Sequence, residues 1–198
     1  MQATLTASQA RLKAAGEQLK NTADENKALK EELERLKKAN AKPMKGNKAA
    51  QLMGDYSKYI YITTEKLSKW LTRNLKVFRE WWEDCVISKL SNEQVMYATD
   101  GHFNSLDDFD LAALLRILSK NWKRLKKYNF MPDSAKDNLD QMFEVRNRWA
   151  HFNSTPPSKD DMVGDLAVIS EFLSFLNCDR EILQEVSRFA EEVEKMEI

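Results

Sequence analysis

The sequence predicts an all-α protein: a bundle of about five helices behind a separate N-terminal helix. Three observations predict this class. Apolar residues recur at helical spacing through most of residues 52–198. No segment alternates apolar and polar residues as a half-buried strand does. The first forty residues carry a heptad pattern. With 198 residues, 42% of them hydrophobic and 31% charged, the chain can form one domain with a core and an extension.

Residues 1–40 are expected to form a coiled-coil dimerisation helix. The core positions recur every seven residues, at Leu5, Leu12, Leu19, Asn26 and Leu33. A buried asparagine such as Asn26 favours a two-stranded register, and Glu25 and Glu32 each precede a lysine by five residues, the spacing of interhelical ion pairs in a parallel dimer. A lone solvated helix with i,i+4 ion pairs is the alternative, because polar residues interrupt the first half of the seam.

Residues 41–51 are expected to be a linker, because Pro43 cannot continue a helix and Gly46 is permissive. The helical bundle is then predicted over residues 52–198. Its first pattern, residues 55–90, fits one long helix or two helices broken near Ile62–Thr64, where β-branched residues lower helix propensity.

Capping residues and helix breakers delimit the remaining helices. These are a short element closed by Asp100–Gly101, a helix from about Asp107 or Asp108 to Lys127, and helices that open at Ser134, Ser158 and Asp179. Ser134 and Ser158 each have an aspartate three residues later, which predicts a box-like cap at both helix starts.

The formal net charge is zero, but the charges are unevenly distributed. Residues 1–50 carry 11 basic and 6 acidic side chains, so residues 51–198 carry 20 and 25. The stretch Arg116–Lys127 holds six basic residues and no acidic one. It fits either a solvated helix face or a strip that contacts RNA phosphates. The candidate RNA-binding residues in it are Lys123, Arg124, Lys126 and Lys127.

Several classes of protein are excluded by what the sequence lacks. No apolar run has the length of a membrane span, and the N-terminus has no hydrophobic signal region. Cys85 and Cys178 stand far apart, which indicates free thiols in a reducing compartment rather than a metal site. No glycine-rich phosphate loop or metal-ligand cluster is recognisable. We therefore expect a cytoplasmic protein without a metal or another cofactor.

The chemistry-bearing segment is the hexapeptide at residues 146–151, Arg-Asn-Arg-Trp-Ala-His. Arginine can bind phosphate oxygens through two donors at once, and the pKa of histidine lies near neutrality. Asn147 could hold a phosphate or orient the imidazole. Residues five apart on a helix differ by about 140° around its axis. Arg146 and His151 can therefore serve one site only if the helix ends or distorts near His151.

This hexapeptide, with its flanks at residues 139–145 and 152–153, resembles the Arg-x4–6-His signature of the HEPN superfamily. Its residue sequence is most similar to that of the Swt-type branch. The resemblance implies a HEPN-like bundle that cleaves RNA without a metal. It implies that Arg146, Asn147 and His151 are catalytic, that Arg148 contacts RNA, and that two protomers share a composite site. It also implies a toxin-like or antiviral role.

Other interpretations remain open. A catalytically silent HEPN module could bind nucleotide or scaffold a larger defence or RNA-processing complex, and a third reading is a coiled-coil adaptor. In a purely structural reading, Arg146 pairs with Asp140 and His151 interacts with the dipole at the helix end. The partners expected are RNA, a second copy of the chain, and an antitoxin or larger defence complex, with no membrane.

Overall fold

The computed structural model describes residues 47–128, 132, 134–152 and 157–196, with side chains from residue 52 onward. These residues belong to one unit of the chain, Pro43–Ile198. The predicted coiled coil, residues 1–40, lies outside the described residues, and so does most of the predicted linker, residues 41–51. Helix α2 begins at Asn47, so the last five residues of that linker are helical.

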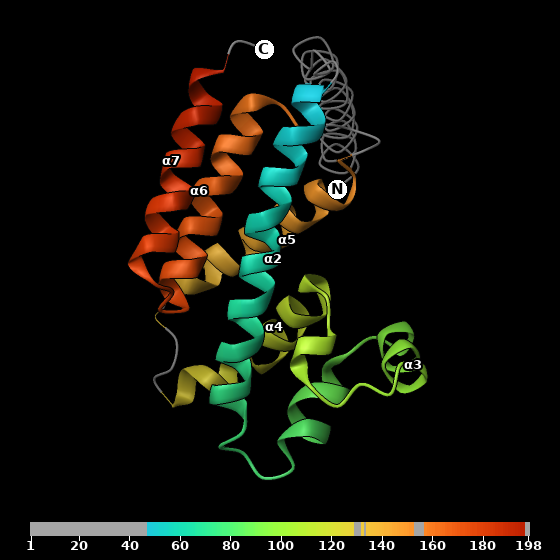
Figure 1. Ribbon diagram of the computed structural model, residues 1–198. Coiled ribbons are helices and arrows are strands. Elements are labelled where there is room, and N and C mark those ends of the chain that lie inside the picture. The colour runs from blue at the N-terminus through green and yellow to red at the C-terminus, as the bar shows by residue number, and fades with distance from the viewer. Residues whose placement is uncertain (1–46, 129–131, 133, 153–156, 197–198) are drawn as a thin grey trace, which may run out of the picture. The chain divides into compact units, whose positions relative to one another are not determined.

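The described residues form helices and no strand, which confirms the predicted all-α bundle (Figure 1). The long helices are α2 (Asn47–Leu75), α4 (Leu111–Lys127), α5 (Ala135–Ala150), α6 (Lys159–Phe175) and α7 (Arg180–Lys195). A nine-residue helix, α3 (Asn92–Asp100), and short helical turns occupy the stretch between α2 and α4.

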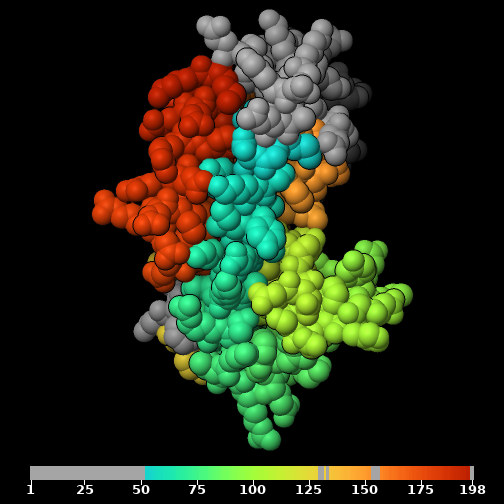
Figure 2. All heavy atoms as spheres, viewed as in Figure 1, coloured from blue at the N-terminus to red at the C-terminus, as the bar shows by residue number. Residues whose placement is uncertain are grey.

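The helices pack in a sequence of neighbouring pairs. Helix α2 contacts α4 and α6, α5 contacts both α4 and α6, and α7 packs against α6. On the face shown in Figure 2, α7 and the segment that precedes α4 flank α2 on its two sides. The fully buried core includes Leu67, Leu71, Leu114, Leu118, Leu139, Met142, Leu166 and Phe172. Burying each such side chain contributes about 1.5–3 kcal/mol to stability.

Helix α2 is continuous through residues 62–64, so the break considered there is wrong. The hydroxyls of Thr63 and Thr64 donate to carbonyls four residues earlier, at 2.7 and 2.8 Å, which keeps both polar groups satisfied inside the helix. The helix instead ends at Leu75. The chain then turns through Glu80, which has a positive φ of 53°, and enters a π-helical turn at Trp82–Val86.

The predicted caps are only partly correct. Ser158 and Asp161 form a capping box at the start of α6, as predicted. At Ser134 the prediction is wrong, because this residue already has helical dihedral angles (φ −64°, ψ −23°) and its hydroxyl makes no capping bond. Before α4, residues 106–108 form a separate 3-10 turn, and Asp110 caps the helix itself.

Candidate active site at the end of helix α5

Helix α5 ends next to His151, the position at which Arg146 and His151 could serve one site. Its last residue is Ala150, and His151 leaves the helical conformation with φ −102° and ψ 9°. The backbone N–H of His151 donates to the carbonyls of Asn147 and Arg148, both at 3.2 Å. The side chains of Asn147 and His151 are exposed, and that of Arg146 is partly exposed. The three candidate catalytic residues therefore occupy the terminal turns of one helix.

The Arg146 guanidinium faces a carboxylate from another helix. Its Nη2 lies 3.5 Å from Oδ2 of Asp110, and its Nη1 donates to Oδ1 of Asn147, also at 3.5 Å. Asp110 caps α4, because its other oxygen accepts the backbone N–H of Ala113 at 2.8 Å. The alternative pairing of Arg146 with Asp140 is not what the structure shows, since Asp140 pairs with Lys136.

The Asp110 carboxylate lies next to Arg146, the arginine that the motif predicts to bind a phosphate. The side chains of Asp110 and Arg146 are 63% and 29% exposed, so water reaches both partners. An exposed ion pair of this kind contributes about 0–1 kcal/mol. A substrate phosphate can therefore replace or join the carboxylate at the guanidinium without a large loss of stability.

Arg148 has a different environment. Its Nε donates to both carboxylate oxygens of Asp165 on α6, at 3.0 and 3.1 Å, and its Nη2 also donates to Asp165. The Asp165 side chain is 1% exposed, and it accepts a third donor, the hydroxyl of Tyr56 on α2, at 2.8 Å. This network joins α2, α5 and α6. Sequence reasoning missed it, although the position of Asp165 among the apolar residues of α6 was a usable signal.

The buried network also affects the pKa values of its members. Burial, followed by the charge of Asp165 and the hydrogen bond to it, raises the pKa of Tyr56 far above its ordinary value. The hydrogen bond to Asp165 raises the pKa of Arg148. Tyr56 therefore stays protonated and Arg148 stays charged at neutral pH, so the carboxylate retains all of its donors.

Two aromatic side chains attach the same turn of α5 to the rest of the bundle. The indole N–H of Trp149 donates to the hydroxyl of Ser57 on α2 at 3.2 Å, and its ring packs against the core. Phe152 is 4% exposed. Trp149 is thus half-buried against α2.

The basic strip lies at the other end of α4 from Arg146. From Asp110 to Arg124 the helix advances about 20 Å at 1.5 Å per residue. Lys123, Lys126 and Lys127 are exposed. Arg124 is exposed as well, and it also donates to Sγ of Cys85 at 2.7 Å and lies 5.2 Å from the centre of the Phe78 ring. Among the four candidate RNA-binding residues of this strip, Arg124 therefore also has contacts within the fold.

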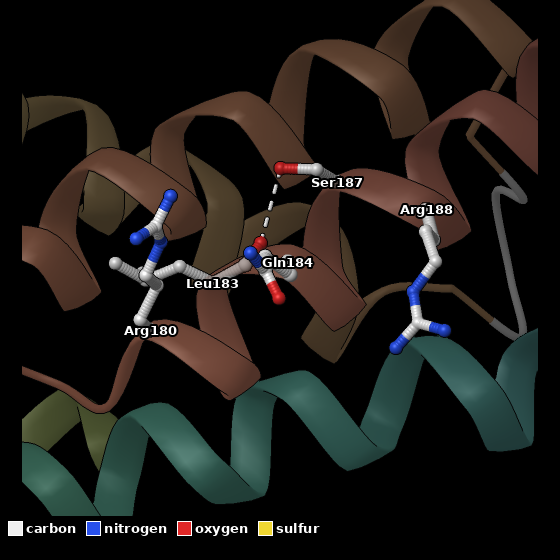
Figure 3. Close-up of a pocket in the computed structure, with 5 residues that line it drawn as sticks. All are labelled: Arg180, Leu183, Gln184, Ser187 and Arg188. Atoms are coloured by element: carbon white, nitrogen blue, oxygen red, sulfur yellow. Dashed lines mark hydrogen bonds between the residues drawn. The ribbon is translucent and has the colours of Figure 1, made fainter.

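Other features of the described residues lie away from the motif. His102, the second histidine, is exposed in the turn after α3 and has a φ of 53°. A shallow surface pocket is lined by residues of α7 alone (Figure 3), namely Arg180, Leu183, Gln184, Ser187 and Arg188. Within the described part of the chain, no group of three His, Cys, Asp or Glu side chains could hold a metal ion. None of the described helices has the length and apolar content needed to cross a membrane.

The comparisons with known proteins agree with the motif. The family model for the Swt1-like HEPN domain matches residues 58–177, which are 120 of the 198 residues and include all of α4, α5 and α6. A search of curated proteins and a search of solved structures returned no match. The matched region contains the hexapeptide, Asp110 and Asp165. The chain therefore belongs to the Swt1-like HEPN family.

Proposed function

We propose that the protein is a metal-independent endoribonuclease of HEPN type, in which two copies of the chain form one composite site. The observation that carries this proposal is the end of α5, where Arg146 and Asn147 contact each other beside the solvent-accessible Asp110 and the helix stops one residue before the exposed His151. The family membership supports the general class of activity. A toxin-like or antiviral role in the cytoplasm, with an antitoxin or larger complex as partner, is the setting that the family resemblance suggests.

The proposed reaction uses the RNA itself as the nucleophile. The 2′-hydroxyl oxygen attacks the adjacent phosphorus, the bond from phosphorus to the 5′-oxygen breaks, and the proton passes from the 2′-oxygen toward the leaving 5′-oxygen. Arg146 stabilises the charge that develops on the phosphorane, because its guanidinium can bind two phosphate oxygens. His151 transfers the proton, since its ordinary pKa lies near neutrality, and Asn147 orients the phosphate or the imidazole.

Dimerisation and RNA binding complete the proposal. Residues 1–40 would pair two chains through the heptad core, which raises the effective concentration of one motif at the other. Lys123, Lys126 and Lys127, with Arg124 beside them, would contact RNA phosphates on either side of the scissile bond. Such contacts are electrostatic and weaken with salt.

The test is cleavage of RNA by the full chain in the presence of EDTA. We expect cleavage of RNA but not of DNA, with a 2′,3′-cyclic phosphate on the upstream fragment. Arg146→Ala should lower the rate by about 10²–10³-fold, because a preorganised charge stabiliser is lost. Arg73→Ala, which removes an exposed arginine from the last turn of α2, is the matched control and should keep the wild-type rate.

Two outcomes would contradict the endoribonuclease proposal. If the purified chain does not cleave RNA, or if Arg146→Ala cleaves like wild type, the silent HEPN module becomes the better interpretation. Mixed dimers test the composite site separately. A dimer with one intact and one Arg146→Ala motif should fall well below half the wild-type rate, whereas independent sites would give half.

A further inference from the structure

Residues 145–152 alternate between two roles along one short segment. Val145 and Phe152 are buried in the core, and Arg148 and Trp149 make polar contacts with α6 and α2. The candidate catalytic residues Arg146, Asn147 and His151 reach solvent, and so does part of the Arg148 side chain, which is 41% exposed. Each solvent-facing candidate therefore has neighbours in sequence that are attached to the bundle.

We propose that Arg148, Asp165 and Tyr56 form a clamp that fixes the last turn of α5 and thereby positions Arg146 and His151. These three are positioning residues. The clamp itself does not depend on the proposed function, whereas its effect on catalysis rests on that function. The contacts that carry it are the two donors of Arg148 on one carboxylate and the Tyr56 hydroxyl on the same carboxylate at 2.8 Å. The three side chains come from three helices, so the clamp ties α5 directly to α6 and, through Asp165, to α2.

The burial of Asp165 explains why this contact is persistent. A carboxylate that is 1% exposed has no water to replace a lost donor, so separating it from Arg148 leaves a buried charge without its counter-ion. Two parallel donors from a planar guanidinium also fix direction as well as distance. Nε and Nη2 of Arg148 therefore both bind the buried carboxylate, where they hold the helix rather than a substrate.

The end of a helix is the part that frays most easily, because its last carbonyls lack helical partners. His151 lies just past the last residue of α5, and its backbone is held by two carbonyls of that final turn. If the turn frays, His151 loses its place relative to Arg146. A displacement of about 1 Å at a reacting group can cost about 10²-fold in rate. The clamp is thus placed to keep the turn closed.

Amide hydrogen exchange tests the clamp without any assay of activity. In Asp165→Asn the side chain keeps its shape but loses its charge. We expect the amides of His151 and Phe152 to exchange at least about 10-fold faster, while amides in the middle of α7 stay within about twofold. Tyr56→Phe, which removes one donor and keeps the ring, should give a smaller increase at the same amides. Unchanged exchange at residues 151–152 in both variants, or a uniform increase across all helices, would overturn the proposal.

Asn138 provides a matched control near the start of α5, ten residues before Arg148. It is buried, and its amide donates to the carbonyl of Val168 on α6 at 3.3 Å. Asn138→Ala therefore removes a buried polar contact between α5 and α6 without touching the clamp. It should leave exchange at His151 and Phe152 unchanged. Faster exchange there in Asn138→Ala would mean that any loss of α5–α6 contact opens the turn, which would count against a specific clamp.

The catalytic consequence is read from RNA cleavage by the same variants. Asp165→Asn and Arg148→Gln should lower kcat at least about 10-fold with KM within about twofold, because binding surfaces away from the turn are intact. Arg148→Lys should recover part of the kcat that is lost in Arg148→Gln, since an ammonium can replace one of the two donors. Local opening in exchange with an unchanged kcat would refute the positioning role. If the wild-type chain does not cleave RNA, the proposed function fails, while the exchange data still decide whether the clamp exists.

Discussion

The two faces of the last turns of α5 show how burial decides what an arginine does. Arg146 and Arg148 stand two residues apart, and each meets one aspartate from a neighbouring helix. The partner of Arg146 is 63% exposed and lies 3.5 Å away, whereas the partner of Arg148 is 1% exposed and is held by two donors. A solvated pair exchanges readily for another anion, and a buried pair does not. In the proposed mechanism, the outer face binds substrate and the inner face maintains the geometry.

The largest expected effect is on the outer face, at His151. His151→Asn should lower the rate of RNA cleavage by about 10²–10⁴-fold, the range for loss of a general acid or base. The matched control is His102→Asn. His102 has a positive φ, which asparagine tolerates better than most residues, so this variant should fold and cleave like wild type. Equal losses in both variants would show that His151 has no special role.

The second prediction compares the two aspartates by stability. Asp165→Ala should lower the free energy of unfolding by about 2–4 kcal/mol, somewhat below the value for a fully buried pair because the Arg148 side chain is 41% exposed. Asp110→Ala should cost only about 1 kcal/mol, mainly through loss of the cap on α4. Urea denaturation of both variants measures the difference. Equal values would remove the distinction between the two faces.

The basic strip of α4 gives a smaller effect, on binding rather than on chemistry. Replacing Lys123, Lys126 and Lys127 with glutamine, while leaving Arg124 to contact Cys85 and Phe78, should weaken RNA binding most at low salt. If all three contact phosphates of a single strand, the slope of log affinity against log salt should fall by about 2. Fluorescence anisotropy at several salt concentrations measures this slope. An unchanged slope would assign the strip to a solvated helix face.

The smallest effect concerns the third member of the inner network. Tyr56→Phe should cost about 1 kcal/mol at neutral pH, because one buried hydrogen bond is lost. The pKa of Tyr56 is raised above its ordinary value of 10.0, so its contribution is complete below pH 10 and is lost as the pH rises above that value. The stability gap between the variant and wild type should therefore narrow above pH 10. A constant gap in urea titrations from pH 8 to pH 11 would contradict this assignment.

Local patterns in the sequence were sufficient for the helical architecture. The apolar spacing predicts helices in the segments that form α4, α6 and α7, and the capping box at Ser158 marks the start of α6, because both signals depend only on residues a few positions apart. The helix break that was one of two alternatives at residues 62–64 and the box-like cap predicted at Ser134 do not form, for the same reason. Helix propensity and a cap motif are local conformational preferences, and the surrounding structure decides whether the chain adopts the preferred conformation.

The hexapeptide by itself indicated the family and the candidate chemical groups, because residue identity and spacing are properties of the chain. Its resemblance to the family signature predicted that Arg146 is catalytic and that Arg148 contacts RNA, but it could not show that the two arginines meet different kinds of carboxylate. Only the packing of α2, α4 and α6 around α5 distinguishes them: it brings a solvated carboxylate to Arg146 and a buried one to Arg148. Asp110 and Asp165 come from 36 residues before and 17 residues after their partners. No local pattern relates such positions, so the tertiary structure alone decides which arginine meets a solvated carboxylate and which meets a buried one.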